Sequence, residues 1–241
     1  MATLIFDIET VGEDFDALDE TTQESLTRWI RRESRDEGEY RASLKDLKEE
    51  LGFSPLTGQI VAIGVLDAER DRGAVYYQSP GSQSPGSEGN VFEEGPFKFE
   101  AMSERDLLAK FWDVAEKYDT FVSFNGRAFD APFLMIRSAI HGIRPGKNLV
   151  ANRYVNYQPG NAKHIDLLEQ LSFYGALRRK GSLHLWTRAF GIESPKAGGV
   201  SGDDVGALYR AGKGEEIARY NSGDLRATLA LYRKYVDFLS L

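Results

Sequence analysis

The sequence predicts an α/β domain in which a mixed central sheet is flanked by helices. Short apolar runs typical of buried strands occupy residues 3–10, 58–66, 74–77 and 120–124. Helical patterns alternate with these runs and dominate the second half of the chain, which is typical of a layered α/β domain. Because 241 residues can bury a substantial core, we expect a single domain over residues 1–241.

The individual elements follow from local patterns. The run 74–77 is expected to pair antiparallel with 58–66 through the turn at 71–73. Ser103, followed by two acidic residues, predicts a helix start. The expected helices cover about 103–118, 131–141, 167–174, 183–190, 203–211, 214–221 and 223–239.

Two segments interrupt this pattern. Residues 13–55 are highly charged with apolar side chains at broadly helical intervals, which indicates an inserted pair of amphipathic helices, or one helix and a mobile piece. This insertion is a candidate contact for a protein partner. Residues 79–90 contain Ser-Pro-Gly-Ser twice, so we expect a flexible loop over about 79–97.

Charge and composition narrow the class of protein. The chain has a net charge of −7, but residues 121–190 hold 10 basic against 3 acidic residues. This basic block is either a solvated surface or a contact for an acidic partner. There are no cysteines, no apolar run long enough to cross a bilayer, and no signal-peptide pattern at the start. We expect a cytoplasmic protein with no membrane partner.

Asp7 and Glu9 are the first candidates for chemistry. They are two apart on a predicted strand, so both side chains project from the same face, opposite Phe6 and Ile8. Two adjacent carboxylates on an apolar strand repel each other and resist desolvation, and a hard divalent cation such as Mg²⁺ or Mn²⁺ would offset that cost. An exposed edge pair or a helix-entry cap is the alternative.

Three further positions are ambiguous by themselves. Asp130 follows a strand and an Asn-Gly turn, where it could cap the next helix or face a crevice at the sheet edge. Tyr220 and Asp224 are four apart, so they share a helix face if the helix continues through Gly223. The alternative is a core tyrosine and an exposed aspartate.

Taken in order, these segments resemble a known family. Phe6-Asp7-Ile8-Glu9-Thr10, then Asn125-Gly126-Arg127-Ala128-Phe129-Asp130, then Tyr220-Asn221-Ser222-Gly223-Asp224 are similar to the three motifs of DEDDy-type 3′→5′ exonucleases. His164-Ile165-Asp166-Leu167 before the third motif is similar to the stand-alone predicted exonucleases related to the proofreading domain of family B DNA polymerases.

The resemblance implies a ribonuclease H-like three-layer fold and a specific site. Asp7, Glu9, Asp130 and Asp224 would hold two divalent cations, Mg²⁺ or Mn²⁺, and Tyr220 would orient the attacking water. The expected activity is removal of nucleoside 5′-monophosphates from the 3′ end of single-stranded nucleic acid, with DNA favoured over RNA. The expected substrate contacts are Thr10, Phe124, Asn125, Arg127, Lys163 and His164. Core packing stays open for Phe124, and a structural role stays open for His164.

Two other functions remain as alternatives. Asp7-Ile8-Glu9-Thr10 is faintly similar to the nucleophile motif of haloacid-dehalogenase phosphatases, but its second acid is Glu and Tyr220 would be unexplained. The chain could also be an inactive nucleic-acid-binding or interaction module on the same fold, although all four carboxylates and the tyrosine are present.

Overall fold

The computed structural model describes residues 2–79, 91–193 and 201–240. Within these residues, one mixed sheet of seven strands has the order β4-β5-β3-β2-β1-β6-β7. The strands are β1 (Thr3–Gly12), β2 (Gly58–Asp67), β3 (Arg72–Tyr77), β4 (Val91–Glu94), β5 (Phe97–Ala101), β6 (Thr120–Ser123) and β7 (Lys163–Asp166). Strand β1 pairs antiparallel with β2 and parallel with β6, and β7 is parallel to β6.

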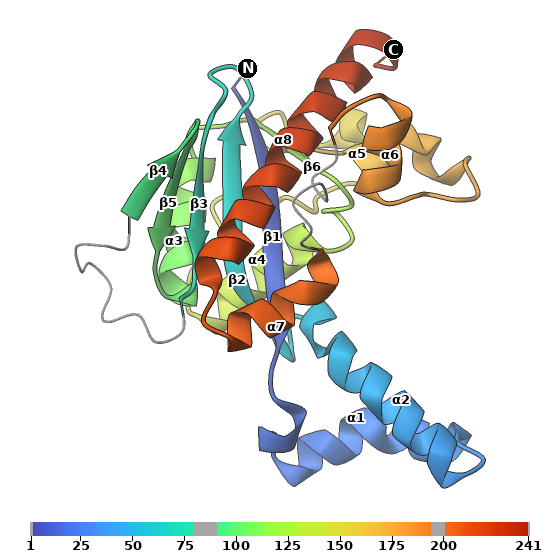
Figure 1. The fold of residues 1–241 in the computed structure, drawn as a ribbon. Helices are drawn as coiled ribbons and strands as arrows, with labels where there is room; N and C mark the ends of the chain where they lie inside the picture. Colours follow the sequence, from blue (N-terminus) through green and yellow to red (C-terminus); the bar gives the residue numbers. More distant parts are fainter. Residues whose placement is uncertain (1, 80–90, 194–200, 241) are drawn as a thin grey trace.

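Helices cover both faces of the sheet and give the α/β architecture that the sequence predicts (Figure 1). One face packs against α3 (Glu104–Ala115) and α4 (Asp130–Ile140). The other packs against the long C-terminal helix α8, which runs from Gly214 to Phe238 and crosses β1, β2 and β3. The shorter helices are α5 (Leu167–Leu171), α6 (Leu183–Ala189) and α7 (Val205–Arg210).

The charged segment 13–55 forms a helical hairpin that projects from the end of β1 (Figure 1). Its helices are α1 (Glu20–Glu33) and α2 (Glu37–Glu50), and α2 contains no buried residue. Phe15 and Leu51 are buried and fix its base. The idea that the hairpin contacts a partner protein stays a prediction.

The loop expected over 79–97 was predicted to extend too far at its C-terminal end. Residues 80–90 lie outside the described residues, but Val91–Glu94 forms β4 and turns at Gly95 (φ 57°) into β5. The Phe92 ring stacks on Phe99, with centroids 4.6 Å apart. Strand pairing and this aromatic contact therefore outweigh the polar composition of the preceding stretch.

Two of the expected helix boundaries also change. The two helices predicted at 214–221 and 223–239 are one continuous helix through Gly223. The helix expected over 167–174 ends at Leu171, because Phe173 and Tyr174 adopt left-handed backbone angles (φ 50° and 56°). None of the described helices combines the length and the apolar character needed to span a membrane.

Candidate active site

Asp7 and Glu9 lie on the face of β1 that is covered by α8. Strand alternation directs Ile5, Asp7, Glu9 and Val11 to this face, and Ile5 and Val11 belong to the core on that side. Glu9 is 8% exposed. The apolar neighbours that make the strand a core element therefore also remove water from its two carboxylates.

Asp130 reaches the same region from the opposite layer. It is the first residue of α4, and its carboxylate Oδ1 accepts the backbone N–H of Ile8 at 3.0 Å. The helix cap is Phe129, which makes no side-chain capping bond, so Asp130 ties α4 to β1 and does not serve as a cap. Its own side chain is buried.

Helix α8 supplies Tyr220 and Asp224 one turn apart, because the helix does not break at Gly223. Single carboxylate oxygens of Asp7, Glu9 and Asp224 all lie within 4.8 Å of one another. Asp130 lies outside this group of three, but its charge raises the pKa of Asp7. The fold thus gathers the four carboxylates from three elements that are distant in the sequence.

Because the carboxyl groups are buried close together, their pKa values are raised. Burial, followed by the charges of Asp130, Glu9 and Asp224, raises the pKa of Asp7 well above its usual range. Burial and then Asp224 raise the pKa of Glu9 in the same way. Burial raises the pKa of Asp130 to about 7, although the Ile8 amide opposes the shift. Without a cation, burial and mutual repulsion therefore favour the protonated forms of these carboxyl groups.

The phenol of Tyr220 is not suited to act as a base. Burial, followed by the charge of Asp224, raises the pKa of its phenol far above the ordinary value, so the hydroxyl stays protonated. A side-chain hydrogen bond with Asp224 acts in the same direction. Tyr220 is therefore available as a hydrogen-bond donor or acceptor beside the carboxylates.

Sequence reasoning missed Asn221. Its side chain is fully buried, and its amide Nδ2 donates to Asp7 Oδ2 at 2.8 Å. A second side-chain hydrogen bond, to Glu9, lowers the pKa of that carboxyl group. Asn221 fits there only because position 64 is glycine, where a Cβ would lie 1.9 Å from Asn221 Oδ1. The only sequence signal is an amide next to Tyr220, which does not reveal either contact.

The site fits hard divalent cations. The donor atoms are carboxylate oxygens, which are the ligands that Mg²⁺ and Mn²⁺ prefer. A bound cation would neutralise the mutual repulsion that raises the pKa values of Asp7 and Glu9. The group of Asp7, Glu9 and Asp224 is already close enough to share an ion.

The predicted substrate contacts lie in different environments. Thr10 donates its hydroxyl to the Gly52 carbonyl at 2.7 Å and lines a groove of about 660 Å³ between the base of the α1–α2 hairpin and α7. Asn125 is exposed in a left-handed conformation (φ 64°). Phe124 is half-buried against the core under α8, and Lys163 is half-buried on β7.

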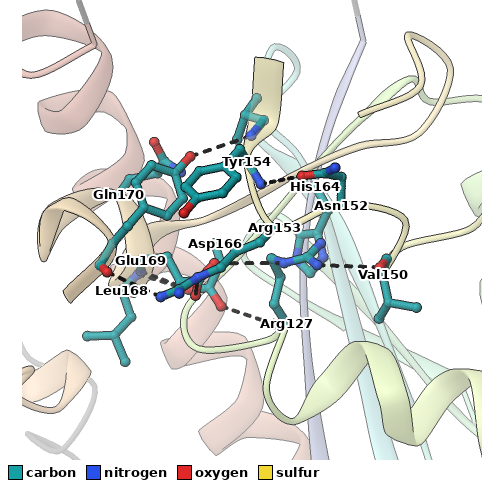
Figure 2. A network of polar contacts seen from close by, with 12 residues as sticks. Arg127, Val150, Asn152, Arg153, Tyr154, His164, Asp166, Leu168, Glu169 and Gln170 are labelled. Atoms are coloured by element: carbon teal, nitrogen blue, oxygen red, sulfur yellow. Dashed lines mark hydrogen bonds and ion pairs between the residues drawn. The ribbon is translucent and has the colours of Figure 1, made fainter. Parts of the chain in front are cut away.

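Arg127 and His164 hold the scaffold together. Arg127 donates to the carbonyls of Leu149 and Val150 and lies 3.8 Å from Glu169 (Figure 2). His164 is fully buried, and its two ring nitrogens contact Ser123 Oγ at 2.7 Å and the Leu149 carbonyl at 2.9 Å. Neither side chain is free for substrate in this conformation.

Asp166 explains the His-x-Asp-Leu segment structurally. Its carboxylate accepts the backbone N–H groups of Asn125 and Arg127 at 2.9 and 3.0 Å, and also caps α5 through Leu168 N at 2.9 Å. Figure 2 shows Asp166 at the centre of this polar network. Asp166 therefore anchors the turn that precedes Asp130 at the end of β7.

Fold and site together define an α/β domain with a cluster of buried carboxylates, and comparison with known proteins identifies the family. The chain belongs to the family described as "Predicted 3'-5' exonuclease related to the exonuclease domain of PolB", whose model matches residues 87–240. The matched residues include Asp130, Tyr220 and Asp224, whereas Asp7 and Glu9 precede them.

The chain is also similar to individual known proteins. An uncharacterised protein of Methanocaldococcus jannaschii is 28% identical over 78% of this chain and 92% of its own length. A DNA polymerase of Pyrococcus glycovorans is 25% identical over 58% of this chain, and the match spans only 19% of that polymerase. The family B DNA polymerase of Pyrobaculum calidifontis shares the fold, with a TM-score of 0.57 and 19% identity over 99% of this chain and 25% of that chain.

Proposed function

We propose that this protein is a metal-dependent 3′→5′ exonuclease that releases nucleoside 5′-monophosphates from single-stranded nucleic acid. The observation that carries the proposal is the approach of Asp7, Glu9 and Asp224 to within 4.8 Å, with Asp130 beside them and Tyr220 on the same helix as Asp224. DNA is the preferred polymer in this proposal, because a relative from Pyrococcus glycovorans is a DNA polymerase.

The proposed mechanism assigns a separate task to each residue. Asp7, Glu9, Asp130 and Asp224 would hold two cations, Mg²⁺ or Mn²⁺, which supply charge for the phosphate and lower the pKa of water when bound. Tyr220, protonated at neutral pH, orients the attacking water through its hydroxyl. Asp130 holds α4 against β1 through the Ile8 amide, so the carboxylates keep their relative positions.

The direct test uses a single-stranded oligonucleotide labelled at its 5′ end. With Mg²⁺ or Mn²⁺ the labelled strand should shorten stepwise from the 3′ end, and Asp7→Ala should abolish shortening. Asp113→Ala, a change of an exposed aspartate on α3, is the matched control and should keep full activity. An intact strand under both metals, with or without binding, would contradict the proposal.

The polymer is tested separately. DNA and RNA oligomers of the same base sequence are digested in parallel, and the ratio of their initial rates is measured. We expect faster digestion of DNA. Faster digestion of RNA would overturn the choice of DNA while leaving the exonuclease proposal intact.

A further inference from the structure

We propose that residues 173–180 form a binding surface for single-stranded nucleic acid, in which Phe173 stacks on a base and Arg178, Arg179 and Lys180 contact phosphates. We call these residues the 173–180 surface. The inference rests on the proposed exonuclease function, since it places the strand that extends from the 3′ end held at the carboxylates. It concerns residues that lie outside all three motifs.

The first observation is backbone strain at two consecutive aromatic residues, the first of which is exposed. Phe173 and Tyr174 are consecutive non-glycine residues with φ of 50° and 56°. Such angles are unfavourable for residues that have a Cβ, and they persist only where surrounding contacts impose them. The Phe173 side chain nevertheless contributes little to the core, because it is 57% exposed.

The contacts that impose this conformation surround Tyr174. Its ring packs on Tyr154, with centroids 4.8 Å apart, and its hydroxyl accepts a hydrogen bond from Gln170 Nε2 at 2.8 Å. Arg153 donates to the Tyr174 carbonyl at 3.3 Å and pairs with Glu169 at 2.7 Å. Figure 2 shows Arg153, Tyr154, Glu169 and Gln170 grouped in this network. Fixing Tyr174 in this way turns the neighbouring Phe173 toward solvent.

The second observation is a fixed backbone that carries three unpaired cations. Arg178, Arg179 and Lys180 are exposed and form no ion pair with any described residue. The backbone around them is held at both ends, because Leu177 N–H donates to the Ser172 carbonyl and Trp186 Nε1 donates to the Lys180 carbonyl at 2.6 Å. The charges are therefore presented from a defined loop beside Phe173.

The third observation is the location of this loop. The carboxylate of Asp166 links the turn before Asp130 to the start of α5, and α5 leads directly to Phe173. Helices α5 and α6 both contact α8, which carries Tyr220 and Asp224. The 173–180 surface thus lies between two helices that pack against α8, on the same side of the sheet as the carboxylates.

The chemistry of the surface selects the ligand. An exposed aromatic ring next to a short basic run is the combination that binds unpaired bases and their phosphates. The protein has a net charge of −7 and a carboxylate-rich site, so a polyanion needs local positive charge to approach. Unpaired arginines beside a stacking ring meet both needs.

The test measures binding without turnover. A short fluorescein-labelled oligothymidylate is titrated with the full-length protein in EDTA, and anisotropy gives Kd over a range of salt concentrations. Phe173→Gly should weaken binding by about 5- to 100-fold through the lost stacking. Because glycine accepts a positive φ without strain, the same change should leave the melting temperature unchanged or raise it. Phe173→Trp, which keeps an aromatic ring, should retain binding.

The charged residues are tested by salt dependence. Replacing Arg178, Arg179 and Lys180 together by alanine should lower the slope of log Kd against log salt by about 2, as expected for three lost phosphate contacts on a single strand. Replacing Arg105, Lys110 and Lys117, which are exposed on or just after α3 on the opposite face, changes the net charge equally. This control should leave both Kd and slope unchanged.

The outcomes separate the two proposals. Unchanged affinity in Phe173→Gly, together with an unchanged affinity and salt slope in the triple variant of Arg178, Arg179 and Lys180, would overturn the 173–180 surface. Equal losses in the control variant of α3 would also overturn it. A loss of binding accompanied by a lower melting temperature in Phe173→Gly would assign Phe173 a structural role. Binding is measured without metal, so an absence of strand shortening in the activity assay would contradict the exonuclease while leaving this result valid.

Discussion

The strongest single prediction concerns Gly64, because a side chain at this position would disturb the residues of α8 that support the carboxylate site. A Cβ at position 64 would lie 1.9 Å from Asn221 Oδ1 and 2.6 Å from Leu225 Cδ1. Both neighbours are fully buried on α8. Asn221 cannot move without losing its hydrogen bond to Asp7, so we expect Gly64→Ala to reduce stability and activity together.

The size of the effect follows from two contributions. Overpacking a buried contact costs about 1–3 kcal/mol. Loss of the hydrogen bond from Asn221 to Asp7 adds about 1 kcal/mol. The free energy of unfolding should therefore fall by about 3 kcal/mol, which for a chain of this size lowers the melting temperature by about 6–12 °C. Activity should fall further, because the carboxylate of Asp7 loses the group that orients it.

Thermal unfolding and oligonucleotide digestion of four proteins test this reasoning: wild type, Gly64→Ala, Asn221→Ala and the double variant. If the clash with Asn221 dominates, the double variant is more stable than the sum of the single changes predicts, by at least about 1 kcal/mol. Gly206→Ala is the matched control, since its Cβ would meet only Arg210 at 3.5 Å. A Gly64→Ala protein with native stability and activity, or strict additivity in the double variant, would refute the argument.

Three other predictions concern the site and its support. Tyr220→Phe should keep the fold, because the ring remains, but lower the rate of digestion by about 100-fold through misplaced water; a native rate would exclude the assigned role. Burial lowers the pKa of His164 to about 4, so the stability that its neutral ring contributes is complete above pH 6.5 and is lost as the pH falls toward 4, by up to about 3 kcal/mol. Urea unfolding across this range should show a smaller acid loss in His164→Gln than in wild type, and parallel curves would contradict this. Mn²⁺ should raise the melting temperature of the metal-free protein, more at alkaline than at acidic pH because protons compete for Asp7 and Glu9. Asp224→Ala should remove most of this shift, and an equal shift in that variant would place the ion elsewhere.

The central part of the fold was predictable because its signals are local. Strands β1, β2 and β3 have continuous or alternating apolar patterns, and α3 has a capping serine whose side chain accepts a hydrogen bond from Asp106 N. Strand β4 was missed because its residues are mostly exposed and follow a polar stretch. Its stability comes from pairing with β5, which a local pattern does not show.

Helix α8 shows how tertiary contacts override a local signal. Glycine in a helix interior costs about 1 kcal/mol relative to alanine, so a break near Gly223 was a reasonable expectation. The continuous helix buries Ile217, Leu225 and Leu229 against the sheet. That burial outweighs the cost of one glycine. The same continuity keeps Tyr220 one turn from Asp224.

The role of Asn221 could not be predicted from the sequence, and the reason differs from that for α8. Its function-related contact is with Asp7, 214 residues earlier in the chain, and the space that it occupies is created by a third segment at Gly64. Motif order made the four carboxylates candidates, but no motif shows this set of contacts. Residues that support a site through packing appear only when the elements are assembled.

The basic block illustrates the limit of counting charges along a sequence. Arg127, Arg137 and Arg153 all belong to it, yet each pairs with a glutamate and serves the scaffold. The tripeptide at 178–180 has no such partner among the described residues. Since salt screens exposed charges beyond about 10 Å, attraction of a phosphate chain depends on these unpaired local charges and not on the net charge of −7. If the proposed surface exists, an acidic protein binds a polyanion through the few cations that have no ion-pair partner among its described residues.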